Sequence, residues 1–154
     1  MASETAGTFP VDAVRAGETE TLVKWLHAGG EIEAPFSLED WTPLQLLASE
    51  GCLPGVISVL DCGARPDGRP LSVLAGVPWQ SPLQIAARYG HSAIVSVLAV
   101  KGADLDLRDS HGFTALHHCA VQGHRPCCEA LLKLGASTSL RTTLPPAVGV
   151  GAGC

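Results

Sequence analysis

The sequence has little charge, few aromatic side chains and no asparagine. Charged residues make up 16% of the 154 residues and aromatic residues 5%, whereas hydrophobic residues make up 46%. A chain this apolar and this weakly charged is not typical of intrinsic disorder, and its length favours one domain with a real core. The absence of asparagine excludes N-linked glycosylation.

Long apolar runs and clusters of basic residues are also missing. No stretch approaches the roughly 18 apolar residues that a membrane-spanning helix needs, so we expect no membrane contact. The net charge of −5 argues against a nucleic-acid partner. The acids gather in residues 1–61 and the bases afterwards, and an acidic half of this kind can steer a basic partner.

The spacing of the cysteines matches no common disulfide or metal-binding pattern. No Cys-x-x-Cys pair occurs, so the spacing fits neither a disulfide framework nor a zinc ribbon. The first residues also lack the basic and then apolar pattern of a secretory signal, which favours a reducing, cytoplasmic location, with the nucleus as an alternative. The six cysteines are Cys52, Cys62, Cys119, Cys127, Cys128 and Cys154.

Three segments of the sequence repeat one another. Each opens with Thr or Ser, runs through apolar residues at helical spacing and reaches a glycine, after which a second apolar stretch leads to another glycine. A weaker copy lies upstream, between Gly17 and Gly29. The three segments are 42–51, 81–90 and 114–123, and their second glycines are Gly63, Gly102 and Gly135.

The ends of each predicted helix follow from local chemistry. Thr42, Ser81 and Thr114 can accept a hydrogen bond from a free amide at a helix N-terminus. Pro43 and Pro82 suit the first helical turn, and the glycines suit the left-handed residue that ends a helix. Each unit is therefore predicted to be a helix, a tight turn, an antiparallel helix and a loop. Because neither helix hides its apolar face alone, the units must stack.

This pattern resembles the ankyrin repeat family, whose units combine a Thr-Pro-Leu-His opening, an Ala-Ala pair, a Gly-His turn and a Gly-Ala-Asp ending. The fourth unit retains Thr114-Ala115-Leu116-His117, Gly123-His124 and Gly135-Ala136. The third unit shows the pattern best, with Ser81-Pro82-Leu83, Ala86-Ala87, Gly90-His91 and Gly102-Ala103-Asp104.

The resemblance covers about residues 8–141 and implies an all-α, ankyrin-type helix-turn-helix solenoid of four repeats, the last incomplete. We expect a flexible N-terminus at 1–7 and a disordered tail at 142–154. The expected units are about 8–41, 42–80, 81–113 and 114–141.

Three departures from the pattern lead to separate expectations. Pro54-Gly55 should disturb the start of the second unit's outer helix. Unit two is longer than unit three, which places an insertion within 65–80, and its segment 70–79 either tucks in or binds a partner. The fourth unit has no visible polar cap, so an alternative to a functional module is a shortened, marginally stable array.

Histidine and cysteine gather in the fourth unit. A metal- or redox-responsive protein is one interpretation of this group, because these side chains are the usual zinc ligands. The alternative is structural: the cysteines replace small apolar residues of the other units, and His117 takes the family's own His position. The group comprises His117, His118, Cys119, His124, Cys127 and Cys128.

The resemblance implies a non-catalytic adaptor, scaffold or inhibitor that binds a protein partner through its loop tips and its concave face. No nucleophile elbow or phosphate loop occurs, so we expect neither an enzyme nor a bound metal, cofactor or small-molecule substrate. Aromatic residues directly before a helix opening, and polar or aromatic residues directly before a turn glycine, are candidate contacts. An alternative for Trp41 and Phe113 is that each folds over a neighbouring unit, and Trp25 is predicted to lie in the core. The predicted partner-binding residues are Trp41, Glu50, Trp79, Arg88, Tyr89 and Phe113.

Overall fold

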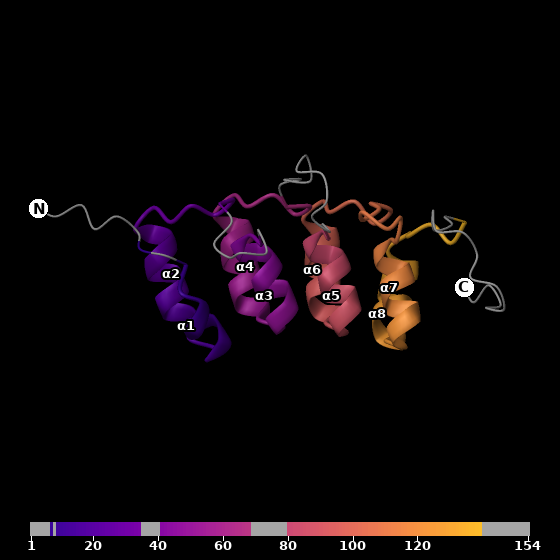
Figure 1. Ribbon diagram of the computed structural model, residues 1–154, viewed down its shortest axis with the longest axis horizontal. Coiled ribbons are helices and arrows are strands. Elements are labelled where there is room, and N and C mark those ends of the chain that lie inside the picture. The colour runs from indigo at the N-terminus through magenta and orange to yellow at the C-terminus, as the bar shows by residue number, and fades with distance from the viewer. Residues whose placement is uncertain (1–6, 8, 35–40, 69–79, 140–154) are drawn as a thin grey trace, which may run out of the picture.

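In a computed structural model the described part of the chain forms four antiparallel helix pairs that stack along one axis (Figure 1). The structure describes residues 7, 9–34, 41–68 and 80–139, and these contain no strand. The predicted all-α solenoid of helix-turn-helix units is therefore confirmed. The pairs are α1 (Val11–Arg15) with α2 (Thr19–His27), α3 (Pro43–Glu50) with α4 (Leu53–Asp61), α5 (Pro82–Tyr89) with α6 (Ser92–Val100), and α7 (Ala115–Gln122) with α8 (Arg125–Lys133).

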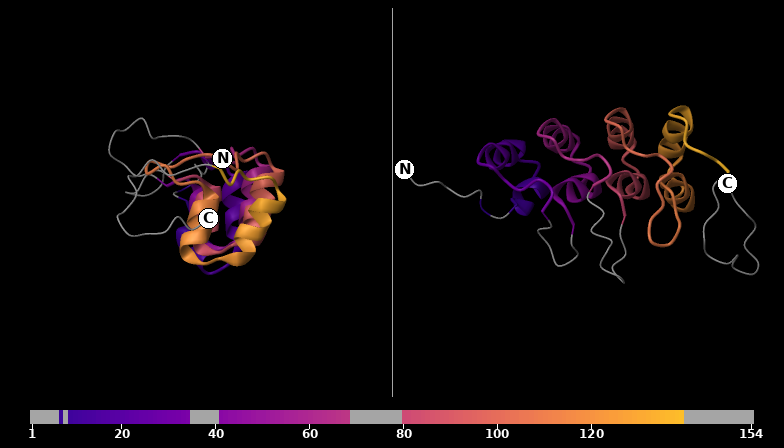
Figure 2. Two further views of the ribbon diagram at one scale, coloured as in Figure 1. Left: turned by 90° about the vertical axis from the view of Figure 1, so that its right-hand side faces the viewer. Right: turned by 90° about the horizontal axis from the view of Figure 1, so that it is seen from above.

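The helices lie in two rows. The inner row holds α1, α3, α5 and α7, and the outer row holds α2, α4, α6 and α8; Figure 2 shows both rows end-on. The connections between units run along one edge of the array, and the tight turns within units lie at the opposite edge. The predicted tail and most of the predicted flexible N-terminus lie outside the described residues, as does most of the insertion.

Each of the last three units opens with the same hydrogen-bonded cap. The side chains of Thr42, Ser81 and Thr114 accept from the backbone N–H three residues on, and that residue's side chain accepts from the cap's own N–H. This reciprocal arrangement satisfies two amides that a helix start otherwise leaves without partners. The first unit lacks it, since α1 begins after Pro10 with no side-chain cap.

Glutamines of the caps also join neighbouring units. The Gln45 amide donates to the carbonyl of Gln80 at 2.7 Å. Gln84 donates to the carbonyls of Leu107 at 2.7 Å and Phe113 at 3.1 Å. The residue that caps one helix therefore also holds the loop that leads to the next unit.

The turn glycines take the left-handed conformation that the sequence predicts, with φ of 73° at Gly51, 82° at Gly90 and 75° at Gly123. Two of them are covered by a histidine of the next unit. A Cβ atom added at Gly51 would lie 2.7 Å from the His91 ring, and one added at Gly90 would lie 2.8 Å from the His124 ring. Glycine is needed at both positions for its backbone conformation and for the close approach of the ring.

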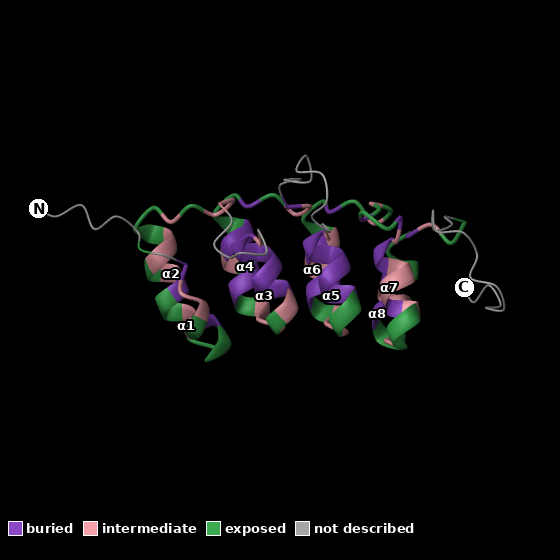
Figure 3. Cartoon of the chain, viewed as in Figure 1, coloured by how far each residue is buried: buried purple, intermediate pink, exposed green. Residues whose placement is uncertain are grey.

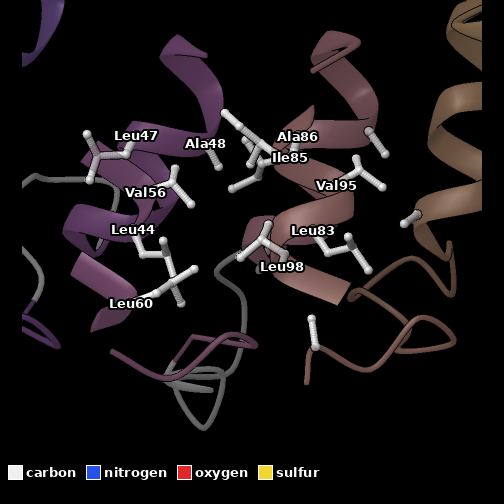
Figure 4. Packing of buried hydrophobic residues seen from close by; sticks show 14 of the residues in the cluster. Leu44, Leu47, Ala48, Val56, Leu60, Leu83, Ile85, Ala86, Val95 and Leu98 are labelled. Carbon is white, nitrogen blue, oxygen red and sulfur yellow. The ribbon is translucent and has the colours of Figure 1, made fainter. Parts of the chain in front are cut away.

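The core is continuous through the stack. Apolar side chains of the second and third units meet between their helix pairs (Figure 4). Both middle inner helices are buried over six consecutive residues, 43–48 in α3 and 82–87 in α5. Burial decreases toward both ends of the array, as Figure 3 shows.

The expected disturbance at Pro54-Gly55 is wrong. Helix α4 begins at Leu53, and Pro54 lies in its first turn, where the missing N–H costs no hydrogen bond. Gly55 is buried, and a Cβ atom there would lie 2.5 Å from the Leu47 side chain. The glycine therefore lets the outer helix approach α3 closely.

Trp25 packs against the core, as predicted, but it is only partly buried. Its ring meets Phe9 edge-on at 5.2 Å, and its indole N–H donates to the Gly7 carbonyl at 2.6 Å. The fully buried residue of α2 is Leu22, one turn earlier, at 1% exposure. The indole covers the end of the array because no unit packs outside it in the described part of the chain.

Candidate partner-binding surface

The structure divides the predicted contact residues between the two ends of the inner helices. Trp41 and Phe113 directly precede the helix caps, whereas Glu50, Arg88 and Tyr89 occupy the last turns of α3 and α5. A helix of this length spans about 12 Å, so these are two separate groups. Trp79 lies outside the described residues and remains a prediction.

The aromatic group near the caps is partly used inside the array. Trp41 is half-buried and packs against the core. The half-buried Phe113 ring lies 5.5 Å from the His118 ring and 6.0 Å from the His117 ring. The Phe113 contacts are with α7 of the next unit, which is what the alternative interpretation of folding over a neighbour predicts for that residue. Both Trp41 and Phe113 remain partly exposed.

The group at the last turns is more exposed. Tyr89 is 49% exposed, and the Arg88 guanidinium lies 5.7 Å from the centre of its ring, within cation–π distance. Glu50 pairs with Arg15 of the first unit, with 3.3 Å between Nε and Oε1. The ion pair of Glu50 and the cation–π pair of Arg88 and Tyr89 thus lie at equivalent ends of α3 and α5. Figure 3 shows that these ends of the inner helices are exposed.

One member of this surface escaped the sequence analysis. Val121 lies in α7 at the repeat position that Arg88 takes in α5, and it is 73% exposed. The sequence feature that could have indicated Val121 is its apolar side chain at a repeat position where the second and third units have the polar residues Ser49 and Arg88. We call the resulting line of side chains the last-turn row, which comprises Arg15, Glu50, Arg88, Tyr89 and Val121.

A buried polar network, also missed, joins the third and fourth units. The Asp109 side chain is 1% exposed, and its Oδ2 lies 2.8 Å from His118 Nε2. Its Oδ1 accepts from the backbone amides of His111 and Phe113, both at 2.9 Å. Gln80 extends the network, because its side-chain Nε2 donates to Asp109 Oδ2 at 3.4 Å and its side-chain Oε1 accepts from Arg88 at 3.4 Å.

The Asp109 carboxyl group remains ionised in this setting. Burial raises its pKa, but the hydrogen bonds from His118, Phe113 and His111 outweigh that effect and hold the pKa below the ordinary aspartate value. An ionised carboxylate only accepts, so His118 Nε2 must carry the proton between them. The pair therefore fixes the orientation of the His118 ring. Gln80 contacts both Asp109 and Arg88, so it links this pair to the last-turn row.

The remaining histidines of the fourth unit are engaged in packing. His117 completes the α7 cap, with Nδ1 2.8 Å from the Thr114 hydroxyl oxygen, and His124 covers Gly90. Across the described ranges, no group of three or more His, Cys, Asp or Glu side chains is arranged to hold a metal ion. The metal alternative therefore has no donor set in this part of the chain.

The cysteines of the fourth unit differ in exposure. Cys119 and Cys127 are buried, whereas Cys128 is half-buried. Burial raises the pKa of both buried thiols, and the contact with Cys128 raises that of Cys119 further. Cys119 Sγ lies 2.7 Å from Cys128 Sγ.

Comparison with known proteins shows similarity to ankyrin repeats. A family model for ankyrin repeats, in three copies, matches residues 71–142. An ankyrin repeat protein of Neurospora crassa, nuc-2, is 32% identical over 132 residues, which are 84% of this chain and 12% of that protein. The ADP-ribosylation factor GTPase-activating protein AGD4 of Arabidopsis thaliana is 38% identical over 76 residues, 49% of this chain and 9% of that protein.

A mouse protein described as ankyrin repeat and SAM domain-containing protein 6 is 42% identical over 62 residues, 40% of this chain and 7% of that protein. The chain thus spans at most 12% of the length of these three relatives. No helix in the described part of the chain has the length and apolar character to cross a membrane.

Proposed function

Since the chain belongs to the ankyrin repeat family, whose repeats generally mediate protein–protein interaction, we propose that it is a non-catalytic binding module whose last-turn row contacts a protein partner. The module acts as an adaptor, scaffold or inhibitor. It recognises its partner through side chains presented by a rigid stack of helices.

One observation supports this surface above the others. Tyr89 and Val121 are exposed on the neighbouring helices α5 and α7, with the Arg88 cation beside the tyrosine ring. Tyrosine and arginine are enriched among residues that dominate binding energy, and an apolar neighbour helps to exclude water from such a contact. The helices beneath them are anchored in the core, so little conformational entropy is lost on binding.

The distribution of charge supports a proposal for which part of the partner faces the first two units. The first two units carry most of the acidic side chains, including the exposed Glu18, Glu20 and Glu31. We therefore propose a partner with a basic segment facing these units and an apolar residue seated beside Tyr89. Electrostatic attraction of this kind raises the rate of association more than the final affinity.

The cytoplasm or the nucleus is the proposed place of action. The support is the sequence pattern alone, since the cysteines are not spaced as in a disulfide framework.

The test compares two surfaces of the same folded protein. Arg88→Ala/Tyr89→Ala removes the centre of the last-turn row, and Ile57→Ala, on the outer helix α4, removes an exposed apolar side chain elsewhere. Each variant is used to capture partners from a cell extract after its thermal unfolding has been matched to that of the wild type. A partner is expected to be lost by the double variant, with at least about a tenfold loss of affinity, and retained by Ile57→Ala.

Retention of the partner by the double variant would place the binding site elsewhere. The same experiment with Trp41→Ala/Phe113→Ala then tests the aromatic group near the caps, as the sequence predicts. Failure of both double variants to change binding would contradict both candidate surfaces.

A further inference from the structure

The fourth unit holds two thiols against each other. Cys119 lies on α7 and Cys128 on α8, and both are free, with 2.7 Å between their sulfur atoms. The other units place apolar pairs at these positions, Leu47 with Val56 and Ala86 with Val95. Two facing thiols thus replace an apolar contact between the inner and the outer helix.

The geometry requires little movement to join the sulfurs. A disulfide bond is about 2.05 Å long, so the two atoms approach by less than about 1 Å. Helices α7 and α8 are already packed together, and a small rotation of each side chain supplies this approach. Cys119 Sγ also lies 3.1 Å from the Leu116 carbonyl, to which its S–H donates, so a lone pair of that sulfur faces Cys128.

We propose that Cys119 and Cys128 are a modification site at which peroxide forms a reversible disulfide that ties α7 to α8. Hydrogen peroxide is the oxidant because it is small enough to reach a half-buried sulfur. This inference does not depend on the proposed partner surface, since it concerns two side chains inside one unit.

Cys128 reacts first because it is the more accessible of the two thiols. Its thiolate attacks one peroxide oxygen, the O–O bond breaks, and hydroxide leaves to be protonated to water, which gives a sulfenic acid. Cys119 sulfur then attacks the Cys128 sulfur, the S–O bond breaks, and the departing hydroxide takes the Cys119 proton to form a second water. Two thiols and one peroxide thus become one disulfide and two waters.

Burial assigns Cys119 the second step. Burial and the neighbouring cysteines raise the pKa of Cys119, so its thiol stays protonated and unreactive toward peroxide in solution. The same protonation supplies the proton that the leaving hydroxide needs. A thiol reductant reverses the reaction by exchange at the Cys128 sulfur, which is the more accessible one.

The disulfide acts on the fourth unit, which packs against one neighbouring unit within the described residues. A unit packed on one side only is expected to unfold locally before the second and third units, which are packed on both sides. A bond that closes a short loop between α7 and α8 restricts that unfolded state. Oxidation should therefore slow the hydrogen exchange of amides in both helices by at least about tenfold.

The experiment uses the full chain with Cys127→Ala, which removes the adjacent buried thiol. The variant is treated with hydrogen peroxide, free thiols are alkylated in denaturant, and the protein is digested with trypsin for mass spectrometry. Trypsin does not cut before Pro126, so the fragment 109–133 then contains Cys119 and Cys128 as its only thiols. The expected fragment has lost two hydrogens, takes up no alkyl group and regains both thiols with dithiothreitol.

A matched control comes from the third unit of the chain itself. Cys119→Ala/Cys128→Val reproduces the apolar pair Ala86 and Val95, and it should fold. Peroxide should slow exchange in α7 and α8 of the Cys127→Ala chain and leave exchange in this control unchanged.

Three outcomes overturn the proposal. The first is a fragment that remains fully alkylated after peroxide. The second is overoxidation of Cys128 to a sulfinic acid while Cys119 is still alkylated. The third is a disulfide that forms without slowing exchange in either helix.

Discussion

The middle and end units of this array share one sequence pattern but differ in how much of it is buried. Helices α3 and α5 each bury six residues in succession, whereas α7 buries only Ala115 and Cys119, and α1 only Val14. Leu83 and Leu116 occupy the same position of the repeat, yet Leu83 is 1% exposed and Leu116 is only partly buried. Burial therefore depends on having a neighbour on both sides, and the repeat motif alone does not determine it.

The largest expected effect comes from truncating that leucine. Leu83→Ala should reduce the free energy of unfolding by about 2–5 kcal/mol, because it removes buried contacts and leaves a cavity in a filled core. Leu116→Ala should cost about 1 kcal/mol, since its side chain already contacts water. Urea denaturation of both variants measures the difference, and equal losses would show that the end unit is as tightly packed as the middle.

A pair of glycines sharpens the comparison. Gly90→Ala and Gly123→Ala both place a side chain at positive φ, which costs about 1 kcal/mol each. Only at Gly90 would the new Cβ atom press on a ring, that of His124, and nothing lies within 4 Å of the corresponding atom at Gly123. Gly90→Ala should therefore lose about 1–3 kcal/mol more in urea denaturation. The prediction fails if the two variants have the same midpoint.

The third prediction concerns the polar contact that fastens the end unit to the middle. Asp109→Asn should lower the free energy of unfolding by about 1–3 kcal/mol at neutral pH, because it weakens the buried hydrogen bonds with His118 and two backbone amides. Urea denaturation measures this loss, which indicates how much the Asp109 hydrogen bonds contribute to the packing of the fourth unit on the third. The exposed Asp12→Asn serves as a control for removing one negative charge.

The same variant should change the response to acid. Burial raises the pKa of Asp109, but its hydrogen bonds prevail, so the folded chain has the lower pKa and the unfolded chain binds more protons between the two values. Wild-type stability should therefore fall as pH drops below about 4, and fall further as it passes through the folded pKa. Asp109→Asn should show a shallower decline. Parallel curves for wild type and variant would remove Asp109 as the cause.

The repeat, its helices and its turns could be predicted because each depends on local chemistry. Thr42, Ser81 and Thr114 begin helices, and the glycines end them, for reasons that lie within a few residues of each. The effect of Pro54-Gly55 is not predictable from the sequence, because the space available to Gly55 is set by Leu47 on another helix. A sequence pattern states which residue is present but not how near the neighbouring helix lies.

The candidate surface was only partly predictable, for a related reason. Glu50, Arg88 and Tyr89 stand out by residue type and by their place before a turn glycine, and the structure finds them exposed. Val121 does not stand out, because an isolated valine indicates a core residue unless its neighbours are known. The contact between Asp109 and His118 depends on two adjacent units and has no signature within either of them.

That contact also limits how the gene for such an array can be recombined. Asp109 belongs by sequence to the third unit and His118 to the fourth, so a crossover at the unit boundary would separate them. Copies of the second or third unit would bring Leu46 or Ile85 to the place of His118, beside a carboxylate that is almost fully buried. A crossover within α6 keeps both partners together. The segment that can be exchanged intact therefore runs from one outer helix to the next. Its boundaries differ from those of the sequence repeat, which begins at the cap of each inner helix.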